Sequence, residues 1–437
     1  MTFFIVMAPL YAMCSVPVWL EADSAKAIEQ RMASDFSLGE AECRMALTHA
    51  YPMLDDTGID TLIINGTLES AVVNGERMFH KKSVRNLALL DPSFGQSWKG
   101  RGGHVSEARM SYADSVIEYV CGNMPDGGAH KVTMRFTIDV PYNPVLDGDT
   151  VRVWMPLPIS SQRQGEVRLL SVFPDSGVVF SNDRSVHNSV YVSAPVVKDE
   201  ELHFGYECEF VTRGEYHHPD TIRKHILPYD ICSEDYCRYT AIHAPHIVRL
   251  DSMANAIVGD ETNPFEQSEL VYDYITSHFP WAGAREYSTI PCIPEYTAER
   301  GYGDCGQVAL LYISLMRTLG VPARWESGWM LHPGEKNLHD WAEVYFEGVG
   351  WVPVDVSFGR YSEAYRTEVR NFYSTGIDAY RFAANKGIGG ELYPPKQYLR
   401  SDTVDFQLGE VESSQGNMFY PGWKQHLYIL KITPYEI

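Results

Sequence analysis

The chain has 437 residues, with 57 acidic and 36 basic side chains and a formal net charge of -21. This length exceeds what one hydrophobic core usually organises, so we expect two or three domains. Nucleic acid is excluded as a partner because phosphate binding needs clustered Lys and Arg, and no basic stripe is present. The eight cysteines are too sparse for a disulfide scaffold.

The N-terminus is apolar. The run from Phe3 to Cys14 resembles the apolar core of a signal peptide without its basic start. It also loosely resembles a lipoprotein cleavage box ending at Cys14, although Tyr11 and Met13 replace the usual small residues. Residues 1–20 are therefore expected to be a signal or lipoprotein segment, which predicts a secreted, periplasmic or cell-surface protein with a lipid anchor at Cys14 as one outcome. A buried segment in a cytoplasmic protein is the alternative.

Residues 21–128 are predicted to form a mostly helical N-terminal region. Helical patterns cover 22–50 and 105–120, and between them the segment 61–90 alternates short apolar runs with Asn-Gly turns. The Pro- and Gly-containing stretch 125–129 is a predicted linker. This region is expected to precede the functional part of the chain.

The hydrophobic period changes to two in the next domain, 129–215. Strand-like segments occur at 132–140, 151–155, 167–173, 189–197 and 202–211. Their spacing predicts a β-sandwich. An α+β domain is expected over 216–375, and strand-like pieces in 376–437 predict a C-terminal extension packed on it.

Three separately spaced signatures fall between Gly301 and Asp355. Cys305 lies in Gly-Tyr-Gly-Asp-Cys-Gly-Gln, His339 opens His-Asp-Trp-Ala-Glu-Val-Tyr-Phe, and Asp355 closes Gly-Trp-Val-Pro-Val-Asp. A cysteine is nucleophilic as thiolate, an imidazole takes its proton, and a carboxylate orients the imidazole. The set predicts acyl transfer through a thioester.

The local pattern around these residues supports that chemistry. An almost wholly apolar run after Cys305 ends at Gly320 and predicts a buried helix that begins at the cysteine. Because helix N-termini favour anions, we expect a lowered thiol pKa and backbone donors for an oxyanion. His339 is expected to begin a strand whose hairpin partner, 351–355, brings Asp355 beside the imidazole.

With these signatures, residues 265–360 resemble the transglutaminase-like superfamily of papain-like cysteine enzymes, in particular bacterial-type secreted transglutaminase-domain proteins. The resemblance implies that Cys305 is the nucleophile, His339 the base and Asp355 the orienting acid. Members commonly use an upstream aromatic or amide side chain as second oxyanion donor, and Trp281 is the candidate here. The implied fold class is α+β, with a papain- or transglutaminase-like catalytic domain after a β-sandwich and a mostly helical N-terminal region.

Structural roles are the alternative for each residue. A Cys at the start of an apolar helix is most often a small buried hydrophobe, and Trp341 and Glu343 are expected to be framework. A metal site would also use Cys, His and Asp, but no zinc motif is present and the pair His217-His218 lacks matching ligands. No metal or cofactor is therefore expected.

Two functions of different classes remain. The first is acyl transfer on amide bonds of a polypeptide or other amide-containing substrate. Hydrolysis is preferred because no dedicated amine-binding site is recognisable, and transglutaminase-type amine transfer is the alternative. In both, thiolate Cys305 attacks the carbonyl, its N–H and Trp281 hold the oxyanion, and His339 protonates the leaving amine. The second is a non-catalytic module that binds a polypeptide or a cell-surface polymer.

Overall fold

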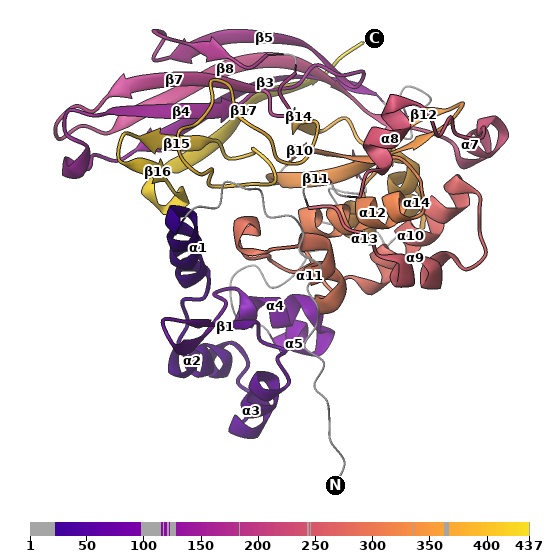
Figure 1. Ribbon diagram of the computed structural model, residues 1–437, viewed down its shortest axis with the longest axis horizontal. Coiled ribbons are helices and arrows are strands. Elements are labelled where there is room, and N and C mark those ends of the chain that lie inside the picture. Colours follow the sequence, from indigo (N-terminus) through magenta and orange to yellow (C-terminus); the bar gives the residue numbers. More distant parts are fainter. Residues whose placement is uncertain are drawn as a thin grey trace.

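The computed structural model describes residues 22–97, part of 115–122, and 128–436 apart from 183, 243, 245, 334 and 362–366. The expected signal or lipoprotein segment 1–20 lies outside the described residues, as do most of the linker at 125–129 and most of the helix at 105–120. The described chain combines helices with several antiparallel sheets, which confirms the predicted α+β class (Figure 1). Within the described ranges, no helix is both long and apolar enough to cross a bilayer.

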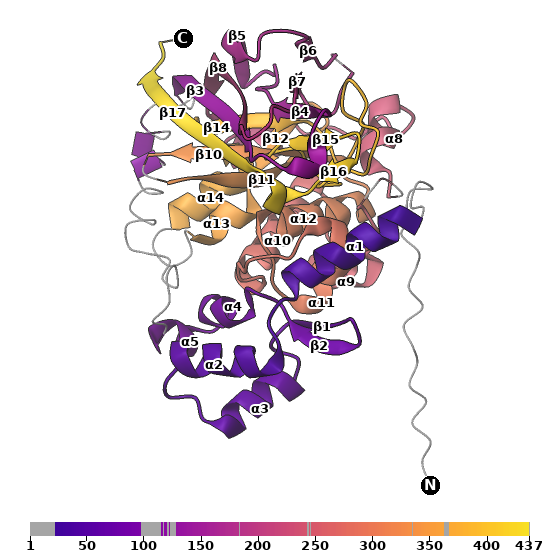
Figure 2. The same cartoon turned by 90° about the vertical axis from the view of Figure 1, so that its left-hand side faces the viewer.

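A small helical unit with one hairpin forms the N-terminal region. Its elements are α1 (Ala22–Asp35), α2 (Glu40–Ala50), α3 (Asp56–Ile64), β1 (Ser70–Val73), β2 (Glu76–Phe79), α4 (Ser83–Leu90) and α5 (Pro92–Ser97). Leu47, Phe79 and Leu87 belong to its own buried cluster. Asn74 and Gly75 join β1 to β2 with positive φ at both positions, as the tight hairpin turn requires. Apart from α1, the unit lies at the end of the molecule opposite the sandwich (Figure 1, Figure 2).

Two antiparallel sheets form the β-sandwich, in the orders β16-β15-β4-β7-β6 and β17-β3-β8-β5. The elements are β3 (Ala129–Val140), η1 (Pro144–Leu146), β4 (Thr150–Pro156), β5 (Gln164–Phe173), β6 (Val179–Phe180), β7 (Ser189–Pro195), β8 (Leu202–Arg213), β15 (Glu410–Ser413), β16 (Gly416–Met418), η3 (Tyr420–Gly422) and β17 (Lys424–Pro434). The predicted alternation holds along β3, where Val132, Phe136 and Ile138 are fully buried.

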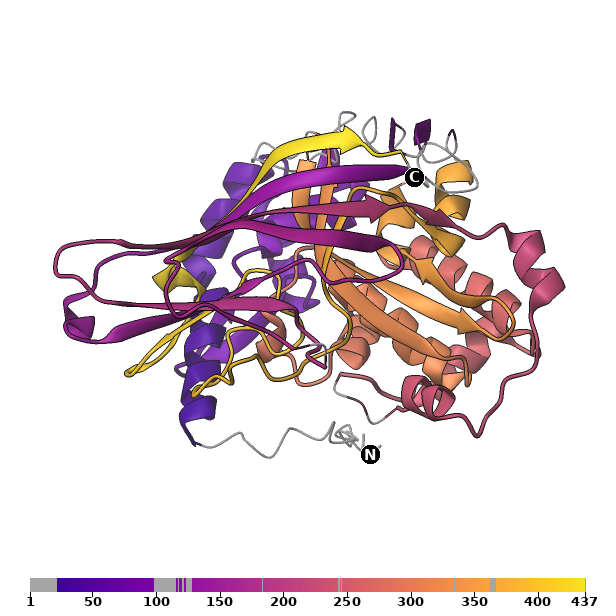
Figure 3. The same cartoon turned by 90° about the horizontal axis from the view of Figure 1, so that it is seen from above.

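The C-terminal segment, expected to be a separate extension on the catalytic domain, contributes strands to two parts of the molecule. β15 pairs with β4, and β17 runs beside β3 (Figure 3). β14 (Arg381–Asn385) instead pairs with a strand of the catalytic sheet. The sandwich therefore includes strands from beyond 129–215. Hydrophobic alternation marks a strand but does not identify a partner distant in the sequence.

The domain predicted to be catalytic contains a four-stranded sheet, β12-β11-β10-β14, with helices on one face. Its elements are β9 (Glu215–Tyr216), α7 (Pro219–His225), α8 (Glu234–Thr240), α9 (Asp251–Val258), α10 (Pro264–His278), η2 (Tyr287–Thr289), α11 (Ile293–Arg300), α12 (Cys305–Thr318), β10 (Ala323–His332), β11 (Glu335–Phe346), β12 (Gly350–Val354), α13 (Val356–Tyr361), α14 (Thr367–Thr375) and β13 (Gly376–Ile377). β13 pairs with β9 outside this sheet.

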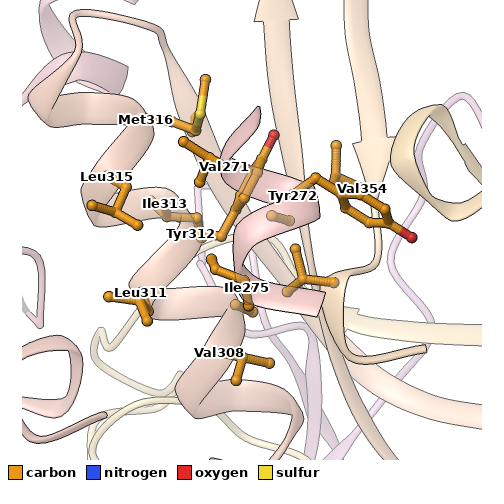
Figure 4. Close-up of a cluster of buried hydrophobic side chains, with 14 of the residues drawn as sticks. Val271, Tyr272, Ile275, Val308, Leu311, Tyr312, Ile313, Leu315, Met316 and Val354 are labelled. Atoms are coloured by element: carbon orange, nitrogen blue, oxygen red, sulfur yellow. The ribbon is translucent and has the colours of Figure 1, made fainter. Parts of the chain in front are cut away.

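Helix α12 is the centre of the catalytic core. It begins at Cys305 and is followed by Gly320 at φ 78°, so both predicted ends are confirmed. Its side chains pack against α10 and the sheet, as Leu311, Tyr312 and Val271 illustrate (Figure 4). A helix buried on all sides cannot rotate or slide without opening cavities, so the position of its first residue is well determined.

The opposite face of the catalytic sheet packs on the sandwich. Trp329 and Leu331 of β10 belong to the hydrophobic cluster of the sandwich. Arg163, which lies just before β5, forms buried ion pairs with Glu326 and Glu343. The indole of Trp341 donates to Glu326 Oε2 at 2.9 Å. Trp341 and Glu343 therefore attach the sheet to the sandwich, which agrees with the framework role predicted for them.

Gly328 provides a test of how closely β10 and β14 approach. A Cβ at this position would overlap the backbone carbonyl of Phe382, where the pairing of the two strands is irregular. Gly328→Ala is expected to lower the free energy of unfolding by about 1–3 kcal/mol, because the strands must separate. Urea denaturation of the full chain measures this. Gly422→Ala is the control, since a Cβ there meets nothing within 4 Å. Equal denaturation midpoints for the two variants would contradict the packing described.

Candidate active site

Cys305 is the first residue of α12 and is half-buried. Asp304 caps the helix by accepting a hydrogen bond from the backbone N–H of Gln307 at 3.1 Å, and it also accepts one from the hydroxyl of Tyr287. The Cys305 thiol donates to Asp340 Oδ2 at 3.3 Å. The predicted nucleophile thus lies at a helix N-terminus with its thiol directed at strand β11.

His339 and Asp355 form a buried pair. His339 Nε2 lies 2.7 Å from Asp355 Oδ2, and Asp355 Oδ1 accepts a hydrogen bond from the backbone N–H of Phe358 at 2.8 Å. Burial opposes ionisation of Asp355, but His339 and Arg381 outweigh it and hold its pKa below the ordinary value. An ionised Asp355 retains the imidazole proton on Nε2, which leaves Nδ1 as the basic nitrogen.

Burial lowers the pKa of His339, and Asp355 only partly opposes this effect. The imidazole is therefore neutral at neutral pH, which is the form that can accept a proton. The geometry between His339 and Asp355 is the one that the hairpin of β11 and β12 was expected to produce.

Cys305 and His339 are not hydrogen-bonded to each other. The thiol instead contacts Asp340, the residue that follows His339 on β11. The structure therefore places Asp355 against the imidazole of His339. The thiol contacts the next residue of β11, Asp340. A hydrogen bond between Cys305 and His339 requires the thiol to leave Asp340.

The pKa of the Cys305 thiol is raised well above its ordinary value. The causes are burial, followed by the nearby carboxyls of Asp340 and Asp304. This is the opposite of the lowered pKa expected from the helix N-terminus, and that expectation is wrong for this structure. Sequence reasoning considered the helix and the imidazole but not the two acidic neighbours.

Several residues of this neighbourhood were not anticipated. Gln407 Nε2 donates to Asp340 Oδ1 at 2.6 Å and to the backbone carbonyl of His339 at 3.0 Å. Arg381 Nη1 lies 3.2 Å from Asp355 Oδ2 and is itself buried. Asp340 could have been noticed because it is adjacent to His339 in the motif. Gln407 and Arg381 carry no local signal, since they reach the site from the C-terminal segment.

Trp281 lies beside the segment that leads into α12. It forms an isolated parallel bridge with Gly303, and the guanidinium of Arg85 is 6.0 Å from its ring centroid. The loop after it is held by Asn86, whose side chain makes two hydrogen bonds of 3.0 Å with the backbone of Gly283. This places Trp281 near the predicted nucleophile. Its role as oxyanion donor stays a prediction.

Within the described residues, no three or more His, Cys, Asp or Glu side chains are grouped in a way that could hold a metal ion. His217, one of the two adjacent histidines considered as metal ligands, pairs with Glu215 at 2.7 Å. Cys232 and Cys237 are exposed free thiols.

Residues 251–356 match the model of the transglutaminase-like superfamily, which confirms the resemblance seen in the motifs. An uncharacterized protein of Bacillus subtilis, YebA, is 28% identical over 149 residues, which are 29% of this chain and 20% of that protein. An uncharacterized protein of Haemophilus influenzae is 23% identical over 244 residues, or 47% of this chain and 64% of that protein. The matches cover less than two thirds of either relative.

Solved structures show more distant likeness. A candidate cysteine protease from Cytophaga hutchinsonii aligns with a TM-score of 0.46 at 15% identity, covering 71% of this chain and 94% of that chain. The periplasmic domain of TgpA from Pseudomonas aeruginosa aligns with a TM-score of 0.25 at 13% identity, covering 60% of this chain and 95% of that chain.

The raised thiol pKa leads to a prediction for alkylation. At pH 7 Cys305 should react with iodoacetamide more slowly than the exposed Cys232 and Cys237, because little of it is thiolate. Its rate should continue to rise at pH values where the exposed thiols have already reached their plateau. Peptide mapping after timed labelling at several pH values measures all three rates. Faster labelling of Cys305 at pH 7 would contradict the electrostatic description.

Proposed function

We propose that the protein is a cysteine-dependent enzyme that cleaves amide bonds of a polypeptide or other amide substrate through a thioester on Cys305. The observation that carries the proposal is the buried hydrogen bond between His339 and Asp355. His339 is followed on β11 by Asp340, the residue that the Cys305 thiol contacts. The transglutaminase-like match over 251–356 supports it, because it includes the nucleophile and the base.

The reaction begins when the Cys305 thiol leaves Asp340 and approaches His339. The thiol proton passes to Nδ1 of His339 while sulfur attacks the amide carbonyl carbon. Backbone N–H groups at the start of α12 stabilise the developing oxyanion. The imidazolium, stabilised by Asp355, then donates its proton to the leaving amine, and a thioester remains. Water attacks the thioester, its proton passes to His339, and release of the acid restores the thiol.

Amine transfer is the second candidate, and the acidic surroundings of the thiol favour it. Asp304 and Asp340 contribute to the field at Cys305, and carboxyls attract a cationic amine toward a reacting centre. Acylation is common to both reactions. They differ in whether water or an amine resolves the thioester, so the products distinguish them.

Substitutions at the three residues test the proposal once an amide substrate is found. Cys305→Ala and His339→Ala should each lower turnover by about 10³-fold or more, and Asp355→Asn should retain more activity, because the orienting residue is the least indispensable. The double variant should be no worse than either single variant, since the residues act as one unit. Cys232→Ala, at an exposed thiol, should keep parental turnover.

Mass spectrometry of the quenched reaction with a panel of peptide amides and amines identifies the acyl-enzyme and the acceptor. Parental turnover of Cys305→Ala would exclude covalent catalysis at this residue. Specific binding of a polypeptide or a cell-surface polymer, with no turnover by the parent, would favour the non-catalytic module instead.

A further inference from the structure

Asp340 is the side chain that receives the thiol hydrogen bond, and the mechanism above gives it no role. We propose that Asp340 restrains the nucleophile: it holds the Cys305 thiol in the free protein and keeps it from reacting until that hydrogen bond is broken. The inference rests on the proposed function for the role of Cys305 as nucleophile.

The packing around the thiol directs Asp340 toward it. Asp340 is 3% exposed, and its Oδ2 is 3.3 Å from Cys305 Sγ. The carboxyl also lies close to the first turn of α12, because a Cβ on Gly306 would be only 2.7 Å from Oδ2. Gly306 therefore provides the space in which the carboxyl and the thiol meet.

Gln407 fixes the other half of the carboxyl. Its amide donates to Asp340 Oδ1 at 2.6 Å and to the backbone of the same strand at 3.0 Å, at His339. The backbone carbonyl of Gln407 in turn accepts a hydrogen bond from the indole of Trp329 at 3.2 Å. With Oδ1 occupied, Oδ2 is the oxygen available to the thiol. Asp340 is thus held in one orientation by side chains from the C-terminal segment and β10.

The charges around the hydrogen bond between Cys305 and Asp340 oppose loss of the thiol proton. The titratable groups that act on Asp340 and its carboxyl neighbours include Cys305, Asp304 and Tyr287 from the helical layer, Asp402, Asp405 and Arg400 from the C-terminal segment, and Arg31 and Lys82 from the N-terminal region. Carboxyls predominate, so a thiolate here would add one more anion to an acidic neighbourhood. Burial and Asp304 also raise the pKa of Asp340 itself, which shows how costly negative charge is at this position.

The restraint determines the order of events. In the free protein the proton stays on sulfur and is shared with Asp340. When substrate displaces the thiol from Asp340, that proton passes to His339 Nδ1 and sulfur forms the bond to the carbonyl carbon, so Asp340 gains no proton in the reaction. A thiol kept protonated is also a poor target for oxidants and alkylating agents, since the thiolate is the reactive form.

Asp340→Asn tests the proposal because it removes the titratable carboxyl while preserving size and an oxygen that can accept from Gln407. The rate of Cys305 alkylation by iodoacetamide at pH 7 should rise by about ten-fold or more, and the pH midpoint of alkylation should fall by at least about one unit. Asp402→Asn is the matched control: it removes a carboxyl of the same neighbourhood that does not touch the thiol, and its effect should be much smaller.

Unchanged or slower alkylation of Asp340→Asn would overturn the proposal, and an equal increase in Asp402→Asn would replace it with a general charge effect. Urea denaturation confirms that the variants are folded. Gln407→Met is a second variant, which releases the carboxyl without removing it, and it should increase alkylation to an intermediate extent. Alkylation is read without turnover, so an active Cys305→Ala would refute the proposed function while leaving this measurement interpretable.

Discussion

The catalytic sheet β12-β11-β10-β14 is buried on both faces, by α12 and its neighbours on one side and by the sandwich on the other. Residues on β11 therefore cannot move independently of either layer, because shifting a strand between two packed faces opens cavities on both. The imidazole of His339 and the carboxyl of Asp340 are presented from this strand. Close packing of the two layers thus positions both the predicted base and the group that contacts the predicted nucleophile.

Two electrostatic environments lie next to each other on that strand. At Asp355 the imidazole of His339 and the buried cation Arg381 outweigh the effect of burial, so the pKa of this carboxyl is lowered and the imidazole is oriented. Around Cys305 the carboxyls of Asp304 and Asp340 are not offset in the same way, and the thiol pKa is high. The predicted base is therefore neutral and oriented in the free protein, while the predicted nucleophile is held as a thiol. In the proposed reaction, the surroundings of Cys305 must change while those of His339 stay as they are.

Local patterns in the sequence were sufficient to predict the helix beginning at Cys305, the hairpin that brings Asp355 to His339, and the family resemblance of the segment that contains the predicted nucleophile and base. Each depends on residues close in sequence or on a contiguous motif. The thiol contact with Asp340 and the support from Gln407 depend on how separate layers meet. Such contacts produce no hydrophobic period and no motif spacing in the sequence, because the packing of the whole chain determines which residues meet.

The C-terminal segment contributes strands both to the sheet that carries His339 and to the sandwich, which limits where the chain can be divided. β14 completes the catalytic sheet, Gln407 supports its site, and β15 and β17 then continue into the sandwich. Cutting the gene at the ends of the segment 251–356 would separate the site from strands and side chains that complete it, and would expose the apolar face of β10. A fragment of residues 251–356 alone is therefore expected to be less stable than the full chain, because it lacks the partners that bury its sheet.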